Sequence, residues 1–249
     1  MRRESAIGNP FVQLVSVSST NNYAMAQVHA GLAGHGACWF AHQQTEGKGQ
    51  RGKAWLAEAG QNILMSIVLE PRHLFAYRQF ELNSAIALAG YDLFSNYAGD
   101  HTKIKWPNDI YYKDRKAGGI LIENVIQGNV WKYAVAGVGI NINQTDFSPE
   151  LPNPISLKQI CSKTFDPVAL AQELCGFLEK RWHQTKENPT EILENYLAGL
   201  YKLGETATLK TGNLIFKAVI KGVNSKGELV VDKGQETAVS FSEIEWLIS

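Results

Sequence analysis

The strongest constraint on the fold is a long hairpin near the middle of the chain. Residues 119–127 and 130–140 are two apolar runs, and the Gly128-Asn129 pair between them is typical of a tight β-turn. The other strand-like runs are residues 11–17, 37–41, 62–70 and 103–106. Helical spacing of apolar residues marks residues 20–33, 78–97, 168–183 and 190–196. Because strands and helices do not alternate strictly, we expect an α+β fold.

The sequence changes in character after residue 203. Short strand-like runs follow one another there, with glycines between or beside them. These runs are residues 206–209, 214–223, 228–231 and 237–241. Regular spacing of short strands with glycine turns is typical of a small β-barrel. We therefore expect two domains, residues 1–203 and a C-terminal barrel of residues 204–249.

Composition restricts the partners and the compartment. Lys plus Arg and Asp plus Glu number 24 each, so the chain lacks the basic excess of a protein that binds DNA or an anionic membrane. Three cysteines without a Cys-x-x-Cys pair indicate a reducing compartment rather than a disulfide scaffold or a zinc site. No long apolar run follows Met1-Arg2-Arg3, and none reaches the length of a membrane span. We expect a cytoplasmic protein.

Residues 47–55, Gly-Lys-Gly-Gln-Arg-Gly-Lys-Ala-Trp, form a glycine-rich loop with three cations. Glycines let the backbone approach a ligand closely, while cations and N–H groups favour a phosphate. The loop also matches the Gly-x-Gly-x-x-Gly pattern of dinucleotide-binding proteins and, in part, a P-loop. Both patterns require a helix after the last glycine, and only residues 54–59 precede Gly60. A mobile, solvated basic loop is the alternative that this segment alone leaves open.

Three further motifs combine polar groups with strand ends. Lys-Trp-Pro-Asn-Asp occupies residues 105–109, where proline ends a strand and the two polar residues can hold a turn. Lys-Ala-Gly-Gly-Ile-Leu-Ile-Glu occupies residues 116–123 and places its lysine at the entrance of a buried strand. Gly-Val-Gly-Ile-Asn follows at residues 137–141. Taken singly, Lys105 could be a surface lysine and Asp109 only a turn residue.

In their order along the chain, the glycine-rich loop and these motifs resemble those of biotin–protein ligases. Ser19-Thr20-Asn21 and Gln44-Thr45 are also similar to that family, although the first group could be only a helix cap. The resemblance covers residues 11–160. It implies a core like that of class II aminoacyl-tRNA synthetases, followed by an SH3-like barrel. It also implies a ligase that converts biotin and ATP, with Mg²⁺, to biotinyl-AMP and pyrophosphate and then biotinylates a lysine of a carrier protein.

The resemblance also implies roles for individual residues. The candidate catalytic residues are Lys116, Arg51 and Lys48. The implied biotin-binding residues are Ser19, Thr20, Asn21, Gln44, Gly47, Lys48, Gly49, Gln50, Trp55, Lys116 and Gly118. The implied ATP-binding residues are Arg51, Lys53, Trp55, Lys105, Asn108, Asp109 and Asn141. The sequence assigns no metal ligand.

Elementary electrostatics agrees with this reading. A carboxylate must approach a triphosphate, and two unit charges roughly 4 Å apart repel by about 4 kcal/mol at an effective dielectric near 20. Several fixed cations and Mg²⁺ are therefore needed. The chain departs from many family members at Gln50, where an arginine is usual. We hypothesise that this neutral residue weakens retention of biotinyl-AMP, and an unchanged release rate in Gln50→Arg would contradict that.

The expected enzyme is a stand-alone ligase, because only eighteen residues precede Ser19 and a DNA-binding domain does not fit there. The expected acceptor is a biotin carboxyl carrier domain of an acyl-CoA carboxylase. A homodimer is compatible with the family, but no interface pattern is legible. A lipoate–protein ligase shares the fold, although lipoate lacks the ureido ring that Gln44 and Thr20 would bind. A non-catalytic small-molecule binding module is the remaining alternative.

Overall fold

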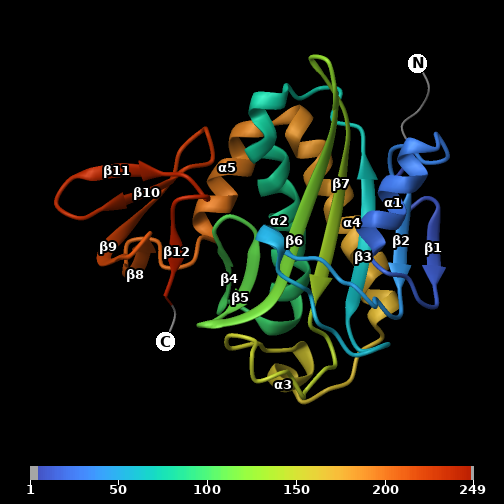
Figure 1. The fold of residues 1–249 in the computed structure, drawn as a ribbon, viewed down its shortest axis with the longest axis horizontal. Helices are drawn as coiled ribbons and strands as arrows, with labels where there is room; N and C mark the ends of the chain where they lie inside the picture. The colour runs from blue at the N-terminus through green and yellow to red at the C-terminus, as the bar shows by residue number, and fades with distance from the viewer. Residues whose placement is uncertain (1–4, 248–249) are drawn as a thin grey trace.

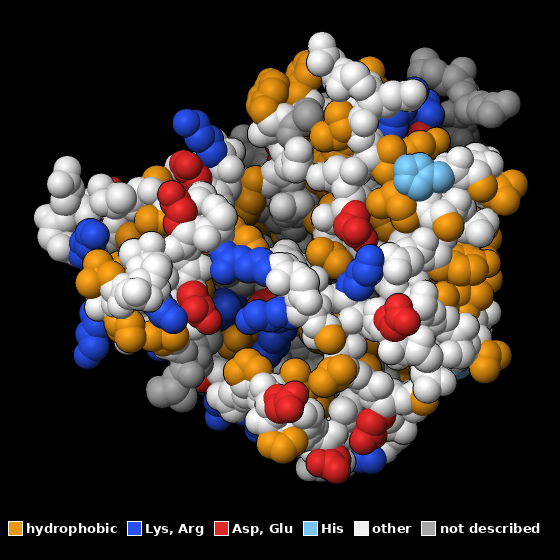
Figure 2. Space-filling model, viewed as in Figure 1, with side chains coloured by type: hydrophobic (Ala, Val, Ile, Leu, Met, Phe, Trp, Pro, Cys, Tyr) orange, Lys and Arg blue, Asp and Glu red, His pale blue; other side chains and the backbone are white. Residues whose placement is uncertain are grey.

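The computed structural model describes residues 5–247. Figure 1 shows a large sheet with helices packed beside it and a smaller sheet formed by the C-terminal part of the chain. On the face shown in Figure 2, Lys and Arg side chains gather in a hollow between these two parts. Met1-Arg2-Arg3, considered above for a signal sequence, lies outside the described residues. Within residues 5–247, no helix is both long and apolar enough to cross a membrane.

The large sheet has seven strands in the order β1-β2-β3-β7-β6-β5-β4. Its strands are β1 (Phe11–Leu14), β2 (Cys38–Ala41), β3 (Ile63–Leu69), β4 (Thr102–Lys105), β5 (Asp109–Tyr112), β6 (Arg115–Gln127) and β7 (Val130–Ile140). β1 and β2 are parallel, and all other neighbours are antiparallel. The predicted hairpin is confirmed as β6 and β7. β5 lies where the sequence predicts only a turn, because the polar residues after Pro107 concealed a short strand.

The helices are α1 (Thr20–His29), α2 (Gln79–Ala98), α3 (Leu157–Cys161), α4 (Pro167–Glu187) and α5 (Pro189–Ala198). Two short 3-10 turns lie at Gln50–Gly52 and Ala76–Arg78. The four predicted helices are confirmed, whereas α3 is too short for helical spacing to reveal it. Strands and helices are thus mixed without strict alternation, as expected.

Helix α1 ends earlier than the sequence predicts. The predicted helix extends to residue 33, but α1 ends at His29, with Ala30 as its C-cap. The N–H groups of Gly31 and Leu32 donate to the carbonyls of Val28 and Gln27. This is the Schellman arrangement, and Gly31 supplies the left-handed residue with φ of 70°. The first glycine able to take this conformation therefore stopped the helix.

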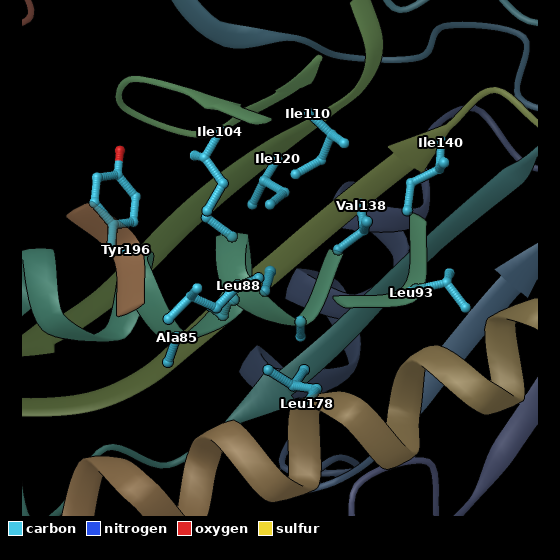
Figure 3. Packing of buried hydrophobic residues seen from close by; sticks show 14 of the residues in the cluster. Ala85, Leu88, Leu93, Ile104, Ile110, Ile120, Val138, Ile140, Leu178 and Tyr196 are labelled. Carbon is cyan, nitrogen blue, oxygen red and sulfur yellow. The ribbon is translucent and has the colours of Figure 1, made fainter. Parts of the chain in front are cut away.

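The two faces of the large sheet are covered differently. On one face, α2 and α4 pack over the strands and enclose a large apolar core that Figure 3 shows from close by. Trp106 belongs to this core and is 1% exposed. On the other face, α1 covers β2, β3 and β7 with a smaller cluster that includes Trp39 and Val135. Helix α1 is short, so part of this second face is left for other groups.

The C-terminal unit is an open sheet rather than the expected barrel. Its strands are β8 (Thr206–Thr211), β9 (Leu214–Val223), β10 (Leu229–Asp232), β11 (Glu236–Val239) and β12 (Glu245–Trp246). They pair antiparallel in the order β11-β10-β9-β8-β12, and the two outer strands do not pair with each other. β12 was not predicted and is only two residues long. Such short outer strands leave the sheet unclosed.

Candidate functional site

One cross-strand row of residues lies on the sheet face that carries α1. The register pairs Leu64 with Gly139, Gly139 with Gly119, Gly119 with Asp109, and Asp109 with Lys105. Residues that pair in this way point to the same face of a sheet. Gly119 and Gly139 therefore form a strip of the sheet without side chains, here called the glycine floor. Asp109 and Lys105 lie beside it.

The indole ring of Trp55 lies on this glycine floor. A Cβ atom at Gly139 would be 2.5 Å from Cε2 of the indole, and one at Gly119 would be 3.2 Å from Cζ3. The Nζ atom of Lys116 is 5.8 Å from the ring centre. The buried Nε1 of Trp55 has no hydrogen-bond partner among residues 5–247. Glycine is required at both positions because a flat aromatic ring approaches the backbone there.

Asp109 joins two lysines beside the floor. Its carboxylate is 2.7 Å from Nζ of Lys116 and 3.8 Å from Nζ of Lys105. The side chain of Lys105 is 14% exposed and lies over the rings of Tyr111 and Trp246. Burial lowers the pKa of the Lys105 ammonium; the Asp109 carboxylate opposes this shift and the Lys116 ammonium adds to it. Lys105 is therefore no surface lysine, and Asp109 is more than a turn residue.

The glycine-rich loop (residues 47–55) folds back as a narrow hairpin. The N–H of Trp55 donates to the carbonyl of Gly47 over 2.8 Å, and the N–H of Gly49 donates to that of Lys53 over 2.7 Å. A Cβ at Gly47 would be 2.4 Å from the carbonyl oxygen of Trp55, so the close pairing requires glycine there. No helix follows the last glycine, which agrees with rejecting the dinucleotide and P-loop patterns. The exposed loop cations are Lys48, Arg51 and Lys53.

A polar group lies at the start of α1. Both the N–H and the hydroxyl of Thr20 lie within hydrogen-bond distance of Oε1 of Gln44, at 2.7 and 3.0 Å. The hydroxyl of Ser66, in the middle of β3, is 2.8 Å from Oγ1 of Thr20. Thr20 and Ser66 are buried, and Gln44 is half-buried. This group brings Thr20 and Gln44 together, as the resemblance implied.

Asn21 is turned toward the sheet. Its amide NH₂ donates to Oε2 of Glu123 over 2.8 Å and to the carbonyl of Leu121 over 3.3 Å. Its Oδ1 accepts from the hydroxyl of Ser66 over 2.6 Å. A Cβ at Gly137 would be 2.4 Å from that same oxygen, so glycine again permits the contact. The structure therefore gives Asn21 contacts that fix α1 on the sheet.

Ser19 and Lys48 also contact the first turn of α1. Ser19 is the N-cap, and its hydroxyl accepts from the N–H of Asn22. Nζ of Lys48 donates to Oδ1 of Asn22 over 2.6 Å. The loop and the helix start are thus tied together by a residue, Asn22, that no motif singled out.

Several of the remaining residues hold strands in place. The amide of Asn141 donates to the carbonyls of Lys116 and Ile155, at 3.4 and 3.1 Å. The buried amide of Asn108 donates to a carbonyl of β6. A Cβ at Gly118 would be 2.9 Å from a carbonyl oxygen of β7. These contacts fix the backbone from which Lys116 projects.

A cavity of about 470 Å³ opens beside the glycine-rich loop. Residues 44–47 and 54–58 form one wall, and the segment after β7 forms the other. It includes three of the expected biotin-binding residues, Gln44, Gly47 and Trp55, but no lysine or arginine lines it. Among the described residues, no group of three or more His, Cys, Asp or Glu side chains is placed to hold a metal ion.

Sequence reasoning left out Gly119, Gly139 and Ser66 as site residues. Gly139 had a visible signal, because Gly137-x-Gly139 places two glycines on one face of a strand. Ser66 also had one, since it is a polar residue inside the apolar run of β3. No sequence signal indicated that the C-terminal unit reaches the site, because segments that are distant in sequence meet only in the folded chain.

Comparison with known proteins agrees with this architecture. The profile of the biotin/lipoate A/B protein ligase family matches residues 14–141. The biotin–[acetyl-CoA-carboxylase] ligase of Paracoccus denitrificans is 28% identical over 227 residues, which cover 88% of this chain and 92% of that protein. The bifunctional ligase/repressor BirA of Bacillus subtilis is 29% identical over 210 residues, or 82% of this chain; the match spans 63% of that protein's length.

A solved structure supplies the corresponding fold. The biotin protein ligase from Aquifex aeolicus, in complex with biotin and ATP, has a TM-score of 0.81 with this structure at 22% sequence identity. The match covers 96% of this chain and 98% of that one. The profile match covers half of the chain. It includes the glycine-rich loop, the charged centre formed by Lys105, Asp109 and Lys116, and both glycines of the floor. The chain belongs to the biotin/lipoate A/B protein ligase family.

Proposed function

We propose that the chain is a biotin–protein ligase. In the first step, a carboxylate oxygen of biotin attacks the α-phosphorus of ATP, the bond to the β-phosphate breaks, and pyrophosphate leaves. In the second step, a lysine amine of a carrier domain attacks the acyl carbon of biotinyl-AMP, and AMP leaves. The observation that carries the proposal is the cross-strand row: it places a bare glycine floor beside two ammonium groups within reach of one carboxylate.

Lys116 is the residue that we assign to the reacting carboxylate and the α-phosphate. Its ammonium lies at the edge of the floor, and Asp109 holds it at 2.7 Å. A fixed positive charge at this position favours the approach of two anions and the charge that develops on phosphorus. We assign the remaining positive charge to the loop, where the side chains of Lys48, Arg51 and Lys53 are exposed.

Magnesium fits this arrangement as an ion carried by the nucleotide. Mg²⁺ in nucleotide sites is commonly held by one or two carboxylates together with substrate phosphates. Asp109 is a carboxylate that already contacts both lysines of the centre. When bound, the ion would neutralise phosphate charge, and its ligands would come mainly from the nucleotide, because Asp109 is already paired with Lys105 and Lys116.

The biotin end of the site is assigned to Thr20, Gln44 and Trp55. The ureido ring needs hydrogen-bond donors and acceptors, because an unmatched buried polar group costs about 1–3 kcal/mol. Thr20 and Gln44 supply them side by side. Trp55 supplies an apolar wall beside the cavity. We assign Ser19 and Asn21 to holding α1 in place.

We also propose the larger setting of this site. Residues 1–203 would form the catalytic domain, with a core like that of class II aminoacyl-tRNA synthetases, and residues 204–249 an SH3-like accessory domain. The mainly antiparallel large sheet and the separate C-terminal sheet support this division. The acceptor would be a biotin carboxyl carrier domain, as the name of the Paracoccus denitrificans relative suggests.

A mass measurement tests the proposal. The protein is incubated with ATP, Mg²⁺, biotin and the carrier domain of an acetyl-CoA carboxylase, and the carrier is weighed by mass spectrometry. We expect the carrier to gain one biotinyl group, and to gain none when ATP is omitted. Pyrophosphate release with biotin but not with lipoate would separate this ligase from a lipoate ligase of the same family. An unmodified carrier, with no pyrophosphate released, would refute the proposal.

A further inference from the structure

The tip of the glycine-rich loop contacts both sheets. The side-chain amide of Gln50 donates to the carbonyl of Ile120 in β6 over 3.4 Å. The guanidinium of Arg51 instead extends to the turn between β11 and β12 of the C-terminal unit, where its central carbon is 4.1 Å from the ring centre of Phe241. Nη2 of Arg51 also donates to the carbonyl of Ile244 over 3.4 Å. The loop tip is therefore held between β6 and the turn that joins β11 to β12.

The ring of Phe241 is itself fixed. It packs edge-on against Trp106, with ring centres 5.6 Å apart. Trp106 is buried, and its Nε1 donates to the carbonyl of Gly227 in the C-terminal unit. The carboxylate of Glu243 accepts from the N–H and the hydroxyl of Ser240, which closes the turn that carries Phe241. The aromatic face that Arg51 meets is thus held by both the catalytic unit and the C-terminal unit.

Arg51 needs such a support because its backbone is unusual. It has φ of 54° and ψ of 36°, the left-handed conformation, which is unfavourable for a non-glycine residue. The side chain is exposed, so the loop itself does not enclose it. Its side chain instead contacts Phe241 and Ile244, in the turn between β11 and β12. The guanidinium would leave this position if Phe241 lost its aromatic face.

We infer that Phe241 is a positioning residue for the acyl-adenylate intermediate and acts through Arg51. The ring keeps the guanidinium over the hollow and keeps the loop tip folded across it. The inference rests on the proposed function, since the retained ligand is biotinyl-AMP. A cation–π contact at an exposed site corresponds to about a two- to fivefold change in an equilibrium or rate.

The first experiment measures release of biotinyl-AMP preformed on the protein. Phe241→Leu keeps an apolar contact with Trp106 but removes the aromatic face, and should release the adenylate about two- to fivefold faster. Phe241→Tyr keeps the face and should release it at the unmodified rate. In an Arg51→Met background, Phe241→Leu should add no further change. An unchanged rate in Phe241→Leu, or an equal increase in both backgrounds, would overturn the inference.

The second experiment needs no ligase activity. Trypsin cleavage within residues 47–55 of the ligand-free protein is followed by mass spectrometry, with melting temperatures recorded for each variant. We expect Phe241→Leu to be cut about two- to fivefold faster than the unmodified protein and Phe241→Tyr to be cut at the same rate. Equal cleavage of all three proteins contradicts the inference, whatever their activity. If the unmodified protein makes no biotinyl-AMP, the proposed function fails, and the cleavage rates still decide whether Phe241 positions the loop.

Discussion

The two faces of strands β6 and β7 differ although their residues alternate along the same backbone. On one face, Ile120 pairs with Val138 and both are buried beneath α2 (Figure 3). On the other, the neighbouring pair Gly119 and Gly139 forms a bare floor under Trp55. The first face supplies apolar burial, whereas the second supplies close access to the backbone. Along this strand pair, residues that stabilise the core therefore alternate with residues that line the candidate site.

Among substitutions on the face that carries the glycine floor, Lys116→Ala should give the largest effect. Removing the ammonium should lower the rate of biotinyl-AMP formation about 100- to 1,000-fold, because the charge that develops at phosphorus loses a fixed partner. The melting temperature should change little, since the side chain is half-exposed. Pyrophosphate release and thermal unfolding check both statements. Lys113→Ala, at an exposed turn, is the matched control, and a Lys116→Ala protein of normal activity would remove the assigned role.

Ile120→Ala, on the face covered by α2, should have the opposite outcome: it should lower stability and leave activity intact. It empties space in the core and should lower the free energy of unfolding by about 2–5 kcal/mol. Activity per folded molecule should be retained at a temperature where the variant is folded. Urea unfolding and pyrophosphate release measure the two quantities. A large loss of activity in fully folded protein would show that the faces are not independent.

Gly139→Ala tests the floor, one residue away from the core pair. The new Cβ would meet the indole of Trp55 at 2.5 Å and displace it. Misplacement of a positioning group by about 1 Å can lower a rate by up to about 100-fold. We expect weaker biotin binding and slower adenylate formation, measured by calorimetry and pyrophosphate release. Gly176→Ala, where an added Cβ meets nothing within 4 Å, is the control and should behave as the unmodified protein.

Lys105→Met should give the smallest change. The folded pKa of Lys105 lies below its ordinary value of 10.5, so the unfolded chain binds more protons between the two values. The buried ammonium therefore destabilises the folded protein fully below the folded pKa, and this destabilisation disappears as the pH rises through 10.5. The variant should therefore melt at an equal or higher temperature at pH 7, and its advantage should shrink in alkali. ATP affinity should fall about tenfold, as for one lost charge-assisted contact.

Lys103→Met, on the same strand, is the control for this substitution. Its ATP affinity should match that of the unmodified protein. A lower melting temperature for Lys105→Met at pH 7 would mean that the contacts with Asp109, Tyr111 and Trp246 outweigh the cost of burial.

The sequence indicated most of the elements because long segments carry periodic apolar residues. It predicted the hairpin of β6 and β7 and the four longer helices. It missed β5, which the polar residues after Pro107 concealed, and it missed α3 and β12, which are five and two residues long and too short to show a period. The barrel expectation was wrong because strand spacing does not reveal whether the outer strands of a sheet meet.

The candidate site was legible in part. The ordered motifs pointed to Lys116, Asp109 and Lys105, and the structure places them together. The separate roles within Ser19-Thr20-Asn21 were not legible, because a helix cap, a ligand contact and a sheet contact use the same residue types. The contact between Arg51 and Phe241 could not be predicted, since 190 positions separate the two residues.

The cap of α1 has a consequence for insertions and deletions. Ser19 sets where the helix begins, and each residue advances the helix by about 100°. One residue inserted between Ser19 and Ala24 would turn Thr20 away from Gln44, so the length of this segment should be invariant among active homologues. At Gly31 and Leu32 the chain is exposed, with Leu32 75% accessible, and length differences should collect there instead.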